Sequence, residues 1–325
     1  MLIVAALGGN ALLRRGEPLD TVTQRRNVRT AAAAIAALAA EHRVVVTHGN
    51  GPQVGLLALQ AESYTAVRPT PLDVLGAESE GMIGYLLEQE IANAAPGRAA
   101  ATLLTQVEVD PNDPAFAAPT KPIGPVYGEA EARRLAAERG WTIARDGAQF
   151  RRVVASPAPI RILELAAIRH LVAAEIIVIC AGGGGIPVAV SPGGAVRGVE
   201  AVIDKDRSAS LLARTIGAEA LLLLTDVDAV YRGWGTASPR RIRSASPEAL
   251  RSLAFAPGSM GPKVEAACDF ASATGKFAAI GALGDAVKLA RGEAGTVIRR
   301  GAGRVTIDGE TARVSRGPRR APDRS

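Results

Sequence analysis

Residues 44–55 read VVVTHGNGPQVG, and this stretch decides the fold class. Its valines and threonine form the short apolar run that is typical of a buried strand. The glycines that follow end the strand, and Pro52 favours the first turn of a helix, which is predicted to continue to about Glu62. A strand, a glycine turn and a helix in this order indicate a parallel α/β unit.

The same succession of strand and helix recurs along most of the chain. Further strands are predicted at 2–7, 102–109, 176–180, 221–225, 277–280 and 296–298. Further helices are predicted at about 24–42, 74–94, 161–174, 207–216, 247–253 and 263–274. This alternation predicts an open, mainly parallel sheet sandwiched by helices. We expect one domain over residues 1–298, because a chain of 325 residues is long enough for an ample core.

Two segments depart from the alternation. Residues 110–161 begin with several prolines, continue in a charged helix at 129–139 and contain short paired strands at 141–154. We interpret about 120–160 as a small protruding subdomain, either a lid over the site or a structural flap. Residues 299–325 form an Arg-rich extension with a hairpin signal at Asp308-Gly309, and we expect it to be largely disordered.

The charge distribution argues against a nucleic-acid partner. The net charge is +6, but residues 299–325 contribute +5 of it, with eight Arg and three acidic side chains, so that residues 1–298 are close to neutral. Aromatic residues make up only 3% of the chain, which leaves few side chains to stack on bases.

Compartment and metal binding follow from the remaining composition. No apolar run approaches the roughly 18 residues that a membrane span needs, so we expect no membrane partner. Residues 1–7 lack a basic region and are predicted to be a strand and not a signal peptide, and we expect a cytoplasmic protein. Cys180 and Cys268 are isolated, as is typical of buried thiols in a reducing compartment, and the three histidines have no metal-ligand spacing.

Three glycine-rich turns each follow a predicted strand, at Gly8-Gly9-Asn10, 48–51 and 182–185. In an open parallel sheet such turns converge on one edge, where backbone N–H groups and helix N-termini bind anions. The dinucleotide pattern is absent, since the glycines at 49, 51 and 55 are spaced one residue too widely, and the P-loop pattern G-x-x-x-x-G-K-[ST] occurs nowhere in the chain. Glycine turns at a sheet edge, together with lysines, supply the hydrogen-bond donors and point charges that phosphoryl transfer needs, so the sequence favours this reaction.

Lysine is scarce in this chain, with five residues against 33 arginines. Three of the five lie in turns, and these are candidates for sites that need a compact ammonium donor: Lys121, Lys205 and Lys263. Lys276 and Lys288 are interpreted as surface residues. Asp206 is either an orienter of neighbouring lysines or the N-cap of the helix that follows, and the two roles are compatible. Asp226 and Asp228 suit ribose or ammonium contacts, although acidic residues after strands are also common caps.

Seven motifs together resemble the carbamate kinase family, whose members have the amino acid kinase fold. The likeness runs from about residue 2 to 298 and is carried, in order, by Gly8–Ala11, His48–Gly55, Gly81–Tyr85, Pro119–Pro125, Ala181–Pro187, Glu200–Asp206 and Ala256–Glu265. Related kinases that act on acetylglutamate, UMP or aspartate usually carry a lysine on the first strand, whereas this chain has Ala5-Ala6-Leu7 there. The resemblance implies that Lys205 supplies that charge instead.

The resemblance also implies a function and a set of site residues. The reaction would be reversible phosphoryl transfer between ATP and carbamate, giving ADP and carbamoyl phosphate, commonly used to form ATP in arginine or related nitrogen catabolism. Catalytic roles would fall to Lys205, Lys263, Asp206 and Lys121. Phosphate and substrate would be bound at Gly8, Gly9, Asn10, Gly49, Asn50 and Gly51. The nucleotide would be flanked by Asp226, Tyr231 and Met260.

Cofactor and assembly are likewise implied. Mg²⁺ would accompany the nucleotide, held mainly by phosphate oxygens and water and not by a carboxylate cage of the protein. A homodimer is expected, with the helix near 74–94 as an interface. The alternatives are another small-acid kinase of the same fold, or a non-catalytic nucleotide-binding sensor. The Arg-rich extension and the segment Asp146–Phe150 have no counterpart that we can identify in the family.

Overall fold

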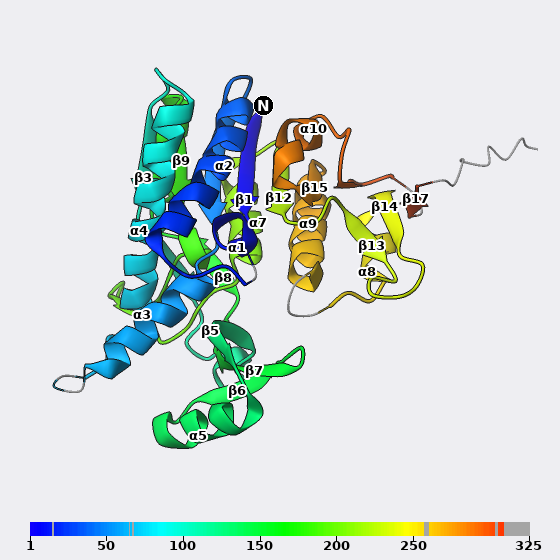
Figure 1. Ribbon diagram of the computed structural model, residues 1–325. Coiled ribbons are helices and arrows are strands. Elements are labelled where there is room, and N and C mark those ends of the chain that lie inside the picture. Colours follow the sequence, from blue (N-terminus) through cyan, green and yellow to red (C-terminus); the bar gives the residue numbers. More distant parts are fainter. Residues whose placement is uncertain (15, 65, 67, 257–259, 303–304, 309–325) are drawn as a thin grey trace, which may run out of the picture.

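A computed structural model describes residues 1–14, 16–64, 66, 68–256, 260–302 and 305–308 (Figure 1). Its largest sheet has ten strands in the order β13-β14-β16-β15-β12-β1-β2-β9-β3, with β17 beside β14. The strands are β1 Leu2–Leu7, β2 Arg43–His48, β3 Ala100–Leu103, β9 Ile177–Cys180, β12 Ala220–Thr225, β13 Val230–Arg232, β14 Arg240–Ala245, β15 Phe277–Ala282, β16 Thr296–Ile298 and β17 Thr306–Ile307. From β3 to β15 all neighbouring strands are parallel.

Helices cover both faces of this sheet, as Figure 1 shows. One face carries α1 Gly9–Leu12, α2 Thr21–Ala39, α4 Leu72–Ala94 and α10 Ala286–Ala290. The other carries α6 Leu165–Ala173, α7 Lys205–Ile216, α8 Pro247–Arg251 and α9 Met260–Thr274. The central strand β1 shows why: Ile3, Ala5 and Leu7 belong to one core, Val4 and Ala6 to the other, and all are fully buried. The predicted α/β sandwich is confirmed.

Two smaller sheets complete the molecule. One has the order β11-β10-β4-β8 and consists of β11 Val196–Gly198, β10 Ile186–Val190, β4 Gln106–Val109 and β8 Pro159–Ile162. The other protrudes below the main body in Figure 1 and consists of β5 Lys121–Tyr127, β7 Gln149–Val154 and β6 Thr142–Asp146, with α5 Glu129–Arg139 beside it. Helix α3 Gly51–Ser63 packs against β5 and connects this subdomain to the core.

Several predicted elements differ from the structure, and the helix predicted at 263–274 is one of them, since α9 begins at Met260. The strand predicted at 102–109 is two strands, because β3 pairs with β9 in the main sheet whereas β4 pairs with β10 in the smaller one. The helix predicted from Arg161 begins at Leu165, since residues 159–162 pair with β4 as β8. The first long helix begins at Thr21 and not near 24, because Asp20 caps it by accepting from Thr23 N–H at 2.8 Å.

The segment after residue 298 is described only in part. Strand β17 pairs antiparallel with β14, so the main sheet extends beyond the boundary predicted for the domain. The rest of the proposed hairpin and the Arg-rich tail from 309 lie outside the described residues. Among the helices of the described part, none has the length and apolarity to cross a membrane.

Candidate active site

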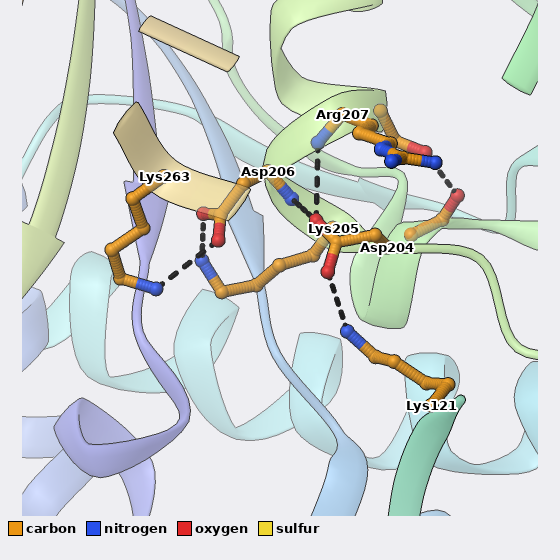
Figure 2. Close-up of polar contacts among 8 residues, drawn as sticks. Lys121, Asp204, Lys205, Asp206, Arg207 and Lys263 are labelled. Carbon is orange, nitrogen blue, oxygen red and sulfur yellow. Dashed lines mark hydrogen bonds and ion pairs between the residues drawn. The ribbon is translucent and has the colours of Figure 1, made fainter. Parts of the chain in front are cut away.

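The beginning of α7 is built on the turn Asp204-Lys205-Asp206. The N-cap is Asp204, so the alternative interpretation of Asp206 as the N-cap is wrong: one carboxylate oxygen of Asp204 accepts from the N–H groups of Asp206 at 2.9 Å and Arg207 at 3.3 Å. Its other oxygen accepts from Lys121 Nζ at 2.6 Å (Figure 2). The cap of α7 therefore also binds the base of the protruding subdomain.

Asp206 joins two of the candidate catalytic lysines (Figure 2). Lys205 Nζ donates to Oδ1 at 2.6 Å, and Lys263 Nζ donates to Oδ2 at 3.1 Å. Asp206 is 3% exposed and Lys205 8%, so water screens the cluster little. The role expected for Asp206, to orient neighbouring lysines, agrees with this geometry. Two ammonium groups held side by side are suited to stabilise the charge of a phosphoryl group.

Burial and charge compete in this cluster. Burial opposes ionisation of Asp206, but Lys205 and then Lys263 hold its pKa below the ordinary value. Burial likewise opposes ionisation of Asp204, yet Lys121 holds the pKa of that carboxyl well below its usual range. Burial lowers the pKa of Lys205, Asp206 raises it again and Lys263 adds to the lowering. Both carboxylates are therefore ionised at neutral pH.

The first two glycine turns meet beside Lys205. Gly8 N–H donates to Leu224 O of β12 at 2.8 Å, and a Cβ at Gly8 would be 2.9 Å from that oxygen. A Cβ at Gly49 would be 3.3 Å from the backbone N of Gly9 and 3.4 Å from Lys205 Cδ. Backbone from both turns therefore lies close to the lysine side chain, at the carboxyl ends of β1 and β2.

The third turn, Gly182–Gly185, follows β9 and packs against Asn50. Gly183 has a φ of +68°, and a Cβ there would be 2.1 Å from Asn50 Nδ2, so only glycine fits. Gly184 O accepts from Ser208 Oγ of α7 at 2.7 Å. The three turns thus gather at one edge of the sheet around the start of α7, as the sequence predicts.

Comparison with known proteins agrees with this geometry. A model described as "Amino acid kinase family" matches residues 1–280. A curated carbamate kinase of Rhizobium meliloti (strain 1021) is 56% identical over 301 residues, which cover 92% of this chain and 93% of the relative. The chain belongs to the carbamate kinase branch of the amino acid kinase family.

Solved structures of that branch have the same fold. Carbamate kinase from Giardia lamblia bound to citric acid is 41% identical, with a TM-score of 0.86 over 92% of this chain and 98% of that one. The Giardia protein bound to AMP-PNP has a TM-score of 0.82, with the same identity and coverage. The resemblance inferred from seven motifs is confirmed.

The three residues predicted to flank the nucleotide lie in or directly after different elements of the structure. Asp226 follows β12 and accepts from Thr225 Oγ1 at 3.0 Å. Tyr231, in β13, donates to Asp228 at 2.9 Å, and its ring lies 5.4 Å from that of Trp234. Met260 is the first residue of α9 and packs partly against the core, one turn before Lys263.

The remaining predicted residues lie at the starts of two helices, α1 and α3. Asn10 is in α1, directly after the Gly8-Gly9 turn. Gly51 is the first residue of α3, and Asn50 is its N-cap position without a side-chain capping bond. Asn50 Nδ2 instead donates to Ser79 Oγ of α4 at 2.8 Å.

Sequence reasoning missed three residues that the structure brings to the site. Asp204 pairs with Lys121. The signal for a role of Asp204 was its place in the Asp204-Lys205-Asp206 turn, where aspartates flank the lysine on both sides. Ser79 and Glu80 of α4 are almost wholly buried behind the glycine turns. A serine and a glutamate within the apolar face of a long helix were the signal there, since such residues are rarely buried without partners.

Proposed function

We propose that this chain catalyses the reversible transfer of a phosphoryl group between ATP and carbamate, giving ADP and carbamoyl phosphate. The observation that supports this most is the position of Lys205, which lies against Gly49, itself next to Gly9, while the first strand carries no lysine. The names of the similar proteins agree with it. Another small-acid kinase of this fold is not favoured, because relatives more than 50% identical are carbamate kinases.

The two lysines that share Asp206 would stabilise the transferring group. Carbamate is already an anion, so its oxygen can attack the γ-phosphorus without a general base, and the bond from that phosphorus to the ADP oxygen breaks. Lys205 and Lys263 would balance the charge that develops on the phosphoryl and leaving oxygens. Asp206 keeps both ammonium groups in place before the substrates bind, so little reorganisation is needed during the reaction.

The glycine turns and the protruding subdomain would supply the remaining contacts. The N–H groups of Gly8, Gly9 and Asn10 would line the path of the phosphoryl group, and Gly49, Asn50 and Gly51 would bind the carbamate side. Lys121 would approach from the base of the subdomain, which we propose acts as a lid. Asp226, Tyr231 and Met260 would flank the nucleotide, with Met260 linked to Lys263 through α9.

Mg²⁺ is proposed to enter with the nucleotide. Within the part of the chain that the structure describes, no three His, Cys, Asp or Glu side chains are grouped to hold a metal ion. Asp204 and Asp206 are both engaged by lysines. The donor set therefore fits an ion held by phosphate oxygens and water, which would neutralise charge on the nucleotide.

Assembly and cellular context are further parts of the proposal. Helix α4 exposes Val74, Met82 and Tyr85, by 42%, 38% and 55%, at positions that share one face of the helix. A second copy of the chain would cover this face in a homodimer. Cys180 and Cys268 are unpaired and buried, as is usual in the cytoplasm, where we place the enzyme. There it would form ATP in arginine or related nitrogen catabolism.

The decisive test is a coupled assay of ATP formation from carbamoyl phosphate and ADP with Mg²⁺. We expect turnover with this pair and none when acetylglutamate, aspartate or UMP replaces carbamate in the reverse direction. Folded protein without activity would contradict the proposal. A non-catalytic sensor would instead bind nucleotide without turnover, and its binding would survive Lys205→Ala.

A further inference from the structure

The motif Gly81-Met82-Ile83-Gly84-Tyr85 has no part in the chemistry described above, although it belongs to the family likeness. It lies on α4, where Gly84 lets the helix approach β3 closely: a Cβ at Gly84 would be 2.2 Å from Thr102 Cγ2. This close approach fixes the depth at which the preceding turn of the helix is buried. That turn carries Ser79 and Glu80.

Glu80 is 1% exposed and has no cation within salt-bridge distance among the described residues. Its Oε1 accepts from Gly182 N–H at 2.8 Å, and its Oε2 accepts from Thr105 N–H at 3.3 Å. Burying a charged carboxyl group is costly unless it is both paired with a cation and hydrogen-bonded, and Glu80 is only hydrogen-bonded, so its place behind the Gly182 turn needs a reason.

Ser79 makes the corresponding contact to the other turn. Its hydroxyl accepts from Asn50 Nδ2 at 2.8 Å and donates to Gly76 O within α4 at 2.9 Å. Consecutive residues of one helix therefore bind two different glycine turns: Ser79 the turn after β2, and Glu80 the turn after β9.

The two turns depend on each other and on α7. Gly183 lies directly against the Asn50 amide, and Gly184 O accepts from Ser208, one turn into the helix that begins with Lys205. A shift of the Gly182 turn would therefore move both Asn50, on the proposed carbamate side, and the start of α7. Misplacement by about 1 Å is enough to cost about 10²-fold in rate.

We propose that Ser79 and Glu80 are positioning residues, which hold the Asn50 turn and the Gly182 turn at the spacing that phosphoryl transfer requires. The inference rests on the proposed function. Neither side chain touches the reacting atoms in this account: Ser79 acts through Asn50, and Glu80 acts through the backbone of Gly182.

The charge state of Glu80 fits this role. Burial raises its pKa to about 8, although the N–H groups of Gly182 and Thr105 oppose the rise and Glu164 adds to it. His48, whose ring also lies against Gly182, has its pKa lowered to about 4, first by burial and, after the opposing effect of Gly49, by Lys205. Burial raises the pKa of the Cys180 thiol, which therefore stays neutral. Glutamine keeps the size and neutral charge of this side chain and one acceptor oxygen, so it can keep the bond from Gly182 N–H but not the longer bond from Thr105 N–H.

The first test compares Glu80→Ala, Glu80→Gln and the control Glu88→Ala in the coupled assay. Glu88 lies two turns further along α4 and also accepts a backbone bond, from Thr102 N–H at 2.8 Å. We expect Glu80→Ala to lower kcat about 10²-fold with the KM for ADP unchanged. Glu80→Gln should lower kcat less than Glu80→Ala, because its oxygen can still accept from Gly182 N–H, and Glu88→Ala should leave kcat unchanged. Equal kcat values for Glu80→Ala and Glu88→Ala would overturn the proposal.

The second test uses Ser79→Ala and remains decisive even if Glu80→Ala does not fold. We expect kcat to fall about tenfold in the wild-type background and to be unchanged in an Asn50→Ala background, because Ser79 acts through Asn50. Additive losses, or no loss, would overturn the role of Ser79. Inactive wild-type protein would instead refute the proposed function itself, which separates the two failures.

Discussion

Two clusters of the site bury carboxyl groups to nearly the same extent but differ in what surrounds them. Asp206, 3% exposed, lies between two lysines, and its pKa is below the ordinary value. Glu80, 1% exposed, accepts from the N–H groups of Gly182 and Thr105, with no cation within salt-bridge distance among the described residues, and its pKa is raised to about 8. Burial opposes ionisation in both, so the neighbouring charge decides the outcome.

The site therefore has a charged cluster around Asp206 and an uncharged pair, Ser79 and Glu80, that supports the glycine turns. At the start of α7 the protein keeps the carboxylates of Asp204 and Asp206 ionised beside lysine side chains, close to the glycine turns, where a phosphoryl group would pass. Behind the turns, Ser79 accepts a hydrogen bond from Asn50 Nδ2 and Glu80 accepts one from Gly182 N–H, and the raised pKa of Glu80 keeps this carboxyl group mostly uncharged at neutral pH. A fixed negative charge at Glu80 would oppose the binding of anionic substrates nearby.

The largest effect is expected from Asp206→Ala. It leaves Lys205 and Lys263 buried side by side without their shared carboxylate, and breaking such a buried pair costs about 3–5 kcal/mol. Chemical denaturation would measure the loss in free energy of unfolding. Asp285→Ala, which removes an exposed partner of Lys288, is the control and should change stability little. Equal effects for the two would refute the comparison.

Lys205→Ala should lower kcat by about 10²-fold or more, because it removes a charge that acts on the transferring group. Lys288→Ala is the matched control, since that ammonium lies on the surface with its side chain 66% exposed. Steady-state rates with carbamoyl phosphate and ADP would measure both. A Lys205→Ala enzyme as fast as the control would remove Lys205 from the catalytic group.

The two carboxyl groups should give opposite dependences of stability on pH. Glu80 has a raised pKa in the folded state, so its contribution is complete below about pH 4.5 and is lost as pH rises towards 8, by up to about 1.4 kcal/mol per pH unit. Asp206 has a lowered pKa, so its contribution is present above about pH 3.8 and is lost as pH falls further.

Unfolding midpoints of wild type and Glu80→Gln between pH 5 and 8 would measure the first dependence. The wild type should lose stability relative to the variant as pH rises, because only the wild type releases a proton there. A constant difference across this range would show that Glu80 stays ionised, and the contrast with Asp206 would then fail.

The smallest effect is expected at a third carboxylate, Glu62 of α3, whose side chain is 18% exposed. It accepts from Arg139 at 2.7 Å, Arg152 at 3.0 Å and the Trp141 indole N–H at 3.2 Å, and so ties the protruding subdomain to α3. Glu62→Gln should cost about 1 kcal/mol in thermal unfolding, because partial exposure screens the pairs. Glu138→Gln, in an exposed pair with Arg134, should cost less.

The sequence was sufficient for local features and for the family. Alternating strands and helices gave the sandwich because each element type has its own period and its own stop signals. Lysine scarcity led to Lys121, Lys205 and Lys263, and the structure places all three on the two aspartates of one turn. The prediction of strands from the sequence was wrong at 102–109, where the chain passes from one sheet to another. The strands that pair there are distant in the chain, so no local pattern shows the change.

Periodicity, turn residues and composition are local properties of the chain, so the residues alone predicted most strands and helices and the lysines of the site. Only the tertiary structure decided which lysine faces which aspartate, that Asp204 caps α7 while binding Lys121, and that Ser79 and Glu80 hold two turns from 29 and 102 positions away. Those contacts depend on burial and on the meeting of distant strands, and they fix whether a buried carboxyl group is charged or neutral.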